Sequence, residues 1–243
     1  MIELLDVTKL YGRLKAVDTL SFRVARGEVV GLIGPNGAGK TTTLRCVAGI
    51  QRPTAGAIRI DGHDVVKDPI EAKRRLAFVP DEPQLFDYLT VTEHLRLVAR
   101  LYQVPDADVS IPPLLDQLEL ADKRSALPGE LSRGMRQKLA VGCALLHRPV
   151  ALLFDEPLTG LDPLGIRRMK QTILACARDG AAVVVSSHLL HLVEEICSRI
   201  VIIAKGRKVA DGTLQELSGH PRLSGADLEQ IFLHVTGHDG EQP

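Results

Sequence analysis

The sequence lacks both a long apolar stretch and an excess of charge of either sign. It has 30 lysines and arginines against 30 aspartates and glutamates, so its formal net charge is zero. A neutral chain argues against a nucleic-acid-binding surface as the main function, although it leaves room for a local basic patch, and no nucleic-acid partner is expected. No apolar run approaches the length that crosses a bilayer, and Met1–Asp6 lacks the basic start of a signal peptide. We therefore expect a soluble cytoplasmic protein, for which any membrane role must come through a partner.

Tryptophan is absent, and asparagine, tyrosine and cysteine are rare. Asn36 is the single asparagine, so the Asn-Lys-x-Asp segment that reads guanine cannot be present, and a GTPase is excluded. Tyr11 precedes a glycine in a polar context, which leaves open both a binding role and a place in the core. The cysteines stand singly among apolar helical residues, which favours buried reduced thiols over disulfides or a metal site. They are Cys46, Cys143, Cys176 and Cys197.

What the chain does contain is a glycine-rich loop between a strand and a helix. An apolar run over 29–33 predicts a buried strand, and helical spacing begins near Leu44, which is the context of the phosphate-loop pattern G-x-x-x-x-G-K-[ST]. Glycines let backbone N–H groups turn inward around an anion, and the next helix points its positive end there. Lys40 is expected to hold the β- and γ-phosphates of a nucleotide, and Thr41 to ligate Mg²⁺. The predicted phosphate-binding residues are Gly34, Pro35, Asn36, Gly37, Ala38, Gly39, Lys40, Thr41 and Thr42.

Polar side chains follow two later apolar runs. The run at 150–154 ends in the adjacent carboxylates Asp155 and Glu156, which packing does not explain because buried carboxylates are costly without cations or hydrogen-bond donors. With the phosphate loop upstream, Asp155 is expected to hold Mg²⁺ through water, and Glu156 to orient and deprotonate an attacking water. The run at 183–185 leads to His188, at the edge where parallel sheets bind ligands.

The order of elements predicts a single α/β nucleotide-binding domain over 1–243 that carries an all-helical insertion. Alternating residues near the N-terminus predict an antiparallel sheet beside the nucleotide site. The α/β core with this sheet is assigned to 1–80 and 150–212, the helical insertion to 81–149, and a helical extension to 213–243.

Sequence signals place the helix starts in the insertion. Thr90 and Glu93 form a capping box, and Ser132 is a good N-cap for the last helix of the insertion. Ser110 is expected to open the helix between them, because two prolines follow at 112–113 and proline is tolerated in a first turn.

The C-terminal part is expected to hold two further helices. Thr213 caps a short one, a linker rich in glycine, proline and serine follows, and 227–237 predicts the last helix before disordered final residues. In the preceding core helix, His191, Glu194 and Glu195 are interpreted as a solvated face rather than a zinc site, because no His-Glu-x-x-His order is present.

Together these motifs resemble the nucleotide-binding subunit of an ATP-binding cassette transporter over nearly the whole chain. Residues 34–41 resemble Walker A, and 150–156 resemble Walker B with its catalytic glutamate. Leu131–Met135 resembles the signature Leu-Ser-Gly-Gly-Gln, Leu161–Asp162 stands where the D-loop belongs, and His188 matches the switch histidine.

Two finer features resemble the export subfamily whose permeases are of the ABC-2 type. One is the Leu-Ser-x-Gly-Met form of the signature, and the other is the tail at 228–237. The resemblance implies a separate transmembrane permease as partner, and a peripheral position at the inner face of the cell membrane.

The resemblance also implies a fold, two cofactors and a mechanism. The fold is a P-loop NTPase with a RecA-like parallel sheet, an N-terminal antiparallel β subdomain and an inserted helical subdomain. ATP and Mg²⁺ bind, Tyr11 stacks on adenine, and Glu156 and His188 act in hydrolysis. Two subunits, as a homodimer or pseudo-dimer, meet head to tail, and Ser132 and Gly134 of one cover the γ-phosphate held by the other. Hydrolysis then opens the dimer.

Several residues depart from the family pattern. Asp81 replaces a glutamine, and it is either a further Mg²⁺ ligand or an ordinary turn residue. Arg133 and Met135 replace a glycine and a glutamine in the signature, while Ser132 is kept. The D-loop has Gly160, preceded by threonine, where Ser-Ala is usual.

Two alternatives remain besides the transporter subunit. One is a soluble cassette ATPase that works on ribosomes or DNA, although such proteins carry fused cassettes or long coiled coils, and neither is present. The other is an ATP-sensing module without turnover, against which Glu156 argues because such a module does not need a base.

Overall fold

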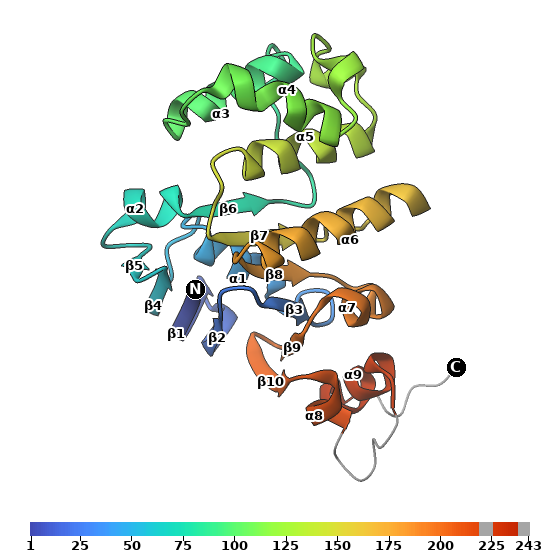
Figure 1. Cartoon of the computed structure of the whole chain (residues 1–243). Coiled ribbons are helices and arrows are strands. Elements are labelled where there is room, and N and C mark those ends of the chain that lie inside the picture. Colours follow the sequence, from blue (N-terminus) through green and yellow to red (C-terminus); the bar gives the residue numbers. More distant parts are fainter. Residues whose placement is uncertain (219–225, 238–243) are drawn as a thin grey trace.

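The computed structural model describes residues 1–218 and 226–237, which form two β-sheets with helices around them (Figure 1). The predicted linker falls largely on 219–225 and the predicted terminal disorder on 238–243, both outside the described residues. The α/β architecture with an antiparallel sheet, expected from the sequence, is confirmed.

The N-terminal antiparallel sheet has the strand order β2-β1-β4-β5. Its first two strands form a hairpin that turns at Gly12, where φ is +57° and glycine is favoured. Bulges in β1 shift its register against β2, so apolar and polar residues do not alternate regularly along this strand. The strands are β1 (Ile2–Tyr11), β2 (Leu14–Val24), β4 (Ala55–Ile60) and β5 (His63–Asp64).

The larger sheet has the strand order β10-β9-β3-β8-β7-β6, and its neighbouring strands are parallel except for β10 with β9. The strands β3, β7 and β8 are buried along their whole length, as runs of valine, leucine and isoleucine predict for a sheet covered on both faces. The six are β3 (Val29–Ile33), β6 (Leu76–Val79), β7 (Ala151–Asp155), β8 (Ala182–Ser186), β9 (Arg199–Ala204) and β10 (Arg207–Gly212).

Four helices of the core pack around these sheets. Met169, Ile173 and Ala177 form the buried stripe of α6, and they belong to the same apolar cluster as alternate residues of β7 and β8. The helices are α1 (Lys40–Val47), α2 (Pro69–Arg74), α6 (Pro163–Arg178) and α7 (Leu190–Ile196).

Residues 81–149 contain helices and no strand, and they form a layer beyond β6 (Figure 1). The expected capping box is present, since Thr90 Oγ1 accepts from the N–H of Glu93 and the Glu93 carboxylate accepts from the N–H of Thr90. Ser132 caps α5 as expected. The elements are α3 (Val91–Leu101), α4 (Ala107–Gln117), α5 (Arg133–Leu145) and the 3₁₀ turns η1 (Ala121–Lys123) and η2 (Pro128–Glu130).

The expected start of α4 at Ser110 is wrong. The helix begins at Ala107, so Pro112 and Pro113 lie inside it rather than in its first turn. Both prolines are on the exposed side, where water can bond the carbonyls that they leave unpaired. Burial of Ile111 and Leu115 on the opposite side holds the helix together despite the missing donors.

The C-terminal helices α8 (Leu214–Ser218) and α9 (Leu228–Thr236) lie where the sequence predicts them. The solvated face expected for α7 is only partly correct: His191 is exposed, but Glu194 is half-buried. Its carboxylate accepts a hydrogen bond of 2.6 Å from the N–H of Leu228 and so anchors the start of α9. This tertiary contact spans 34 residues, and no local pattern indicates it.

The four cysteines are free thiols, as expected. Burial raises the pKa of Cys143 and Cys197 to about 12 and that of Cys176 to about 11, so these thiols are poor nucleophiles at neutral pH. Within 1–218 and 226–237, no helix is long and apolar enough to span a membrane.

Candidate nucleotide-binding site

The glycine-rich loop runs from the end of β3 to the start of α1 and is packed closely by neighbouring strands. A Cβ on Gly39 would lie 2.4 Å from the carbonyl oxygen of Ala16 in β2, and the φ of Gly39 is +105°. A Cβ on Gly34 would lie 2.3 Å from the carbonyl oxygen of Ile203 in β9. Only glycine fits at both positions, so the sequence pattern fixes the shape of the loop.

Lys40 is buried at the base of this loop. Its Nζ donates to the carbonyl oxygens of Gly34 at 2.7 Å and Pro35 at 3.4 Å. Burial lowers the pKa of the Lys40 ammonium, and the nearby charges of Glu156 and Asp155 partly offset this shift. A buried ammonium at the start of a helix favours an anion in the loop, as the sequence predicts.

The site brings Asp155, at the end of β7, beside Thr41 in α1. Asp155 is 4% exposed, and its Oδ1 accepts from Thr41 Oγ1 at 3.3 Å and from Ser186 Oγ at 2.6 Å. A buried carboxylate oxygen beside the hydroxyl oxygen of a half-buried threonine is the type of oxygen ligand set that Mg²⁺ prefers. Ser186 was not among the predicted site residues, although a polar residue at the end of an apolar strand is the signal that could have found it.

Glu156 and His188 are in direct contact. The carboxylate Oε2 of Glu156 accepts from His188 Nδ1 at 2.8 Å and from the backbone N–H of His188 at 3.3 Å. Since a carboxylate only accepts, Nδ1 is the protonated ring nitrogen in this pair. The φ of Glu156 is +51°, an unusual conformation for a glutamate, and its N–H donates to both the hydroxyl and the carbonyl of Ser186 at 3.1 Å. The backbone is thereby held in the position that aims this side chain.

Tyr11 is 43% exposed at the tip of the β1–β2 hairpin, so a place in the core is ruled out. Its hydroxyl bonds the side chain of Gln51, and Lys9 Nζ lies 5.2 Å from the ring centre. The hairpin is also the element whose Ala16 packs against Gly39. An exposed aromatic ring therefore stands on the strand pair that flanks the phosphate loop.

Ser132 and Gly134 are not brought to the loop of their own chain. Ser132 is exposed at the start of α5, and its Oγ accepts from the N–H of Met135 at 3.3 Å. A Cβ on Gly134 would contact Leu161 Cδ2 at 3.7 Å, so the signature lies beside the D-loop. Among the hydrogen bonds and ion pairs of the described residues, none joins either signature residue to Lys40.

Asp81 forms an ion pair that the sequence did not indicate. Arg133 Nη2 lies 3.2 Å from Asp81 Oδ1, and both side chains are about half exposed. Burial raises the pKa of the Asp81 carboxyl, the Arg133 charge lowers it, and Glu156 and Asp155 raise it further. Asp81 is therefore within electrostatic reach of the carboxylates at the end of β7.

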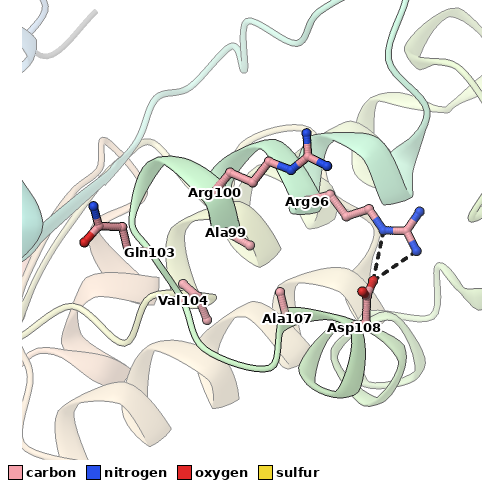
Figure 2. A pocket seen from close by; sticks show the side chains of 7 residues that line it. All are labelled: Arg96, Ala99, Arg100, Gln103, Val104, Ala107 and Asp108. Carbon is pink, nitrogen blue, oxygen red and sulfur yellow. Dashed lines mark hydrogen bonds and ion pairs between the residues drawn. The ribbon is translucent and has the colours of Figure 1, made fainter.

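A separate hollow lies on the insertion between α3 and the start of α4 (Figure 2). Its volume is about 470 Å³, its small side chains are Ala99, Val104 and Ala107, and an ion pair joins Arg96 to Asp108. None of the predicted site residues lines this hollow. It is distinct from the convergence of β3, β7 and β8 described above.

The sequence pattern of the family described as "ABC transporter" matches residues 17–159. The chain belongs to the ABC transporter family. It is 34% identical to the ABC-type transporter ATP-binding protein EcsA of Bacillus subtilis (strain 168), covering 98% of both chains. It is 38% identical to the Nod factor export ATP-binding protein I of Paraburkholderia xenovorans (strain LB400), covering 95% of this chain and 76% of that one.

Solved structures of ABC ATPases share the fold. An ATP-binding subunit of an ABC transporter superposes with a TM-score of 0.92 at 36% identity, over 97% of this chain and 99% of that chain. The dimeric ATP-binding cassette MJ0796, bound to ADP and Pi, superposes with a TM-score of 0.80 at 27% identity, over 88% of this chain and 99% of that chain. The ABC chain described here thus has the P-loop ATPase fold that the sequence predicted.

Proposed function

We propose that this ABC protein is the ATP-hydrolysing subunit of an exporter and works in a head-to-tail dimer on a separate permease. The observation that carries the proposal is the convergence of Lys40, Thr41, Asp155, Glu156 and His188 at one edge of the sheet. Similarity to the Nod factor export protein and the Leu-Ser-x-Gly-Met signature favour export.

The residues present suit ATP and Mg²⁺. The loop at 34–42 supplies backbone donors and the Lys40 ammonium for the phosphates, and the start of α1 adds its positive end. Thr41 Oγ1 and Asp155 Oδ1, 3.3 Å apart, would hold Mg²⁺, Asp155 through water. When bound, the metal ion would offset charge on the phosphates.

Glu156 would orient a water molecule and accept its proton. His188 holds the carboxylate through two hydrogen bonds, so the base does not need to be ordered when the nucleotide arrives. The strained backbone of Glu156 is consistent with a side chain held for function rather than for packing.

The exposed start of α5 supports the head-to-tail dimer. Ser132 and Gly134 lie at a helix N-terminus that attracts an anion, and no hydrogen bond or ion pair of the described residues joins them to Lys40. In a dimer they would cover the γ-phosphate held by Lys40 of the second copy. ATP then forms part of the interface, and hydrolysis weakens it.

Exposed aromatic residues support a docked permease. Phe86 is 61% exposed and Tyr88 is 93% exposed, both on the segment that joins β6 to α3. Large exposed apolar side chains that lie close together mark contact surfaces. A permease bound here would place the subunit at the inner face of the membrane.

Co-purification in mild detergent tests this function. One polytopic membrane protein should co-purify with the tagged chain isolated from membranes. The same protein should not co-purify with the tagged Tyr88→Ser variant. Val109→Ser, a matched change at a side chain of α4 that is 74% exposed, should retain it. Recovery of ribosomal or DNA-repair components instead would favour the soluble cassette ATPase, the alternative function.

Tyr11 is proposed to stack on adenine. Base–aromatic stacking is worth about 1–3 kcal/mol, so Tyr11→Ala should weaken ATP binding about tenfold or more. Tyr11→Phe keeps the ring and loses only the hydroxyl contact to Gln51, so its affinity should stay near wild type. Calorimetric titration measures both, and unchanged affinity in the alanine variant would contradict stacking.

Asp81 is proposed as an additional oxygen ligand near the metal. Because a hard cation prefers a charged oxygen, Asp81→Asn should raise the Mg²⁺ concentration needed for half-maximal ATPase activity. Asp81→Gln, which restores the residue usual in the family, should keep much of the activity. A Mg²⁺ titration with the wild-type midpoint in both variants would make Asp81 a turn residue only.

A further inference from the structure

Three of the residues that depart from the family pattern meet at one point. Arg133 Nη2 lies 3.2 Å from Asp81 Oδ1, and a Cβ on Gly160 would lie 2.9 Å from Arg133 Nη1. Arg133 is the first residue of α5, Asp81 follows β6, and Gly160 lies between β7 and α6. One guanidinium group, on the first turn of a helix in the insertion, therefore meets both the segment after β6 and the loop after β7.

Gly160 leaves the space that this arrangement needs. Its φ is +72°, a conformation that side chains disfavour, and a Cβ there would also lie 3.0 Å from Arg133 Cζ. The alanine that is usual at this position would be strained and would displace the guanidinium. The absence of a side chain at Gly160 therefore makes room for the guanidinium group of Arg133.

Arg133 also needs a carboxylate for an electrostatic reason. It places a cation at the positive end of α5, whose first turn contains no acidic residue, and this arrangement is unfavourable without a counter-charge. Asp81 supplies that counter-charge from the segment that follows β6. An exposed ion pair of this kind shifts an equilibrium by a factor of about 1.5 to 5. It should therefore favour the ordered first turn of α5 over the frayed one by that modest factor.

We propose that Arg133 is a positioning residue that ties the start of α5 to Asp81 and to the Gly160 loop of the same subunit, and so presents Ser132 to the second copy. This inference rests on the head-to-tail dimer proposed above. Arg133 acts through its neighbour Ser132, whose hydroxyl and carbonyl accept from the N–H groups of Met135 and Arg136. Removing the ion pair between Arg133 and Asp81 should therefore make these two hydrogen bonds open more often.

Amide exchange in the nucleotide-free subunit tests the tie without requiring a dimer. Arg133→Gln and Asp81→Asn should each raise the NMR-measured exchange rates of Met135 and Arg136 by about 1.5- to 5-fold. The double variant should exchange no faster than the faster single variant, and 1 M salt should remove the difference from wild type. Arg100→Gln, at an exposed arginine of α3 in the same insertion, is the matched control and should change nothing. Wild-type exchange rates in both single variants would show that the ion pair does not hold the start of α5. Effects of the two substitutions that multiply in the double variant would show that they act independently and would also contradict the proposal.

Dimerisation tests the positioning role. In a Glu156→Gln background, Arg133→Gln should raise the ATP concentration at half-maximal dimer formation by up to about 5-fold. Its ATP affinity as a monomer, measured without Mg²⁺, should be unchanged, because among the hydrogen bonds and ion pairs of the described residues none joins Arg133 to the phosphate loop. If the Arg133 variant dimerised at the same ATP concentration as the Glu156→Gln protein, Arg133 would not position Ser132. If the Glu156→Gln protein itself stayed monomeric with ATP, the proposed dimer would be wrong, and the amide-exchange rates would still decide whether Arg133 holds the start of α5 through Asp81.

Discussion

Glu156→Gln is expected to lower ATP turnover by roughly 10²- to 10⁴-fold while leaving ATP binding near wild type. The amide keeps the shape of the side chain and can accept from His188, but it cannot take a proton from water. The carboxylate already receives two hydrogen bonds from His188, so the glutamine side chain should stay in the same place. The loss of turnover should therefore come from the missing proton acceptor and not from disorder of the side chain. Steady-state phosphate release and a nucleotide titration on the same sample separate the two effects.

A matched control for this prediction is Glu195→Gln, which removes an exposed carboxylate of α7 that is paired with Lys170. This variant should turn over ATP at the wild-type rate, because Glu195 lies outside the proposed site. Near-normal turnover in the Glu156 variant would remove Glu156 from the role of base.

Lys40→Met is expected to weaken ATP binding about 10- to 150-fold. A hydrogen bond to a charged group contributes about 1.5–3 kcal/mol, and each 1.4 kcal/mol changes the affinity tenfold. Burial lowers the pKa of the Lys40 ammonium, so removing this charge offsets part of what its hydrogen bonds to the carbonyls of Gly34 and Pro35 contribute to stability. An apolar side chain of similar length should therefore lower the thermal midpoint only slightly.

Calorimetric titration with ATP and a thermal melt on one sample check both parts of this prediction. Lys73→Met, at an exposed lysine of α2, is the control and should bind ATP as wild type does. Tight ATP binding by the Lys40 variant would show that the phosphates are held elsewhere. A large drop in its thermal midpoint would show that Lys40 supports the fold itself.

The phosphate loop and the carboxylate pair could be predicted because each is specified locally. Gly34 and Gly39 permit a backbone approach that no other residue allows, and the short apolar run before Asp155 is typical of a strand buried on both faces. Capping boxes such as Thr90 with Glu93 are equally local, since both hydrogen bonds lie within four residues. Parallel pairing of β3, β7 and β8 then brings their ends together without further information.

What the sequence did not indicate depends on contacts between distant segments. The early start of α4 reflects burial of Ile111 and Leu115, which outweighs the local preference of two prolines. Glu194 reaches Leu228 across 34 residues, and Arg133 reaches Asp81 across 52. The first contact joins a carboxylate to a backbone N–H and the second joins two charged side chains, and a single sequence does not state which distant segments meet.

Sedimentation velocity of the Glu156→Gln protein tests most directly whether ATP is held between two copies of the chain. With Mg²⁺ and ATP, we expect a dimer that contains one ATP per subunit, because the nucleotide on the loop of one copy meets the Ser132 turn of the other. Without nucleotide, the same protein should sediment as a monomer. A monomer at saturating ATP, or a dimer that forms equally well without nucleotide, would contradict the shared site.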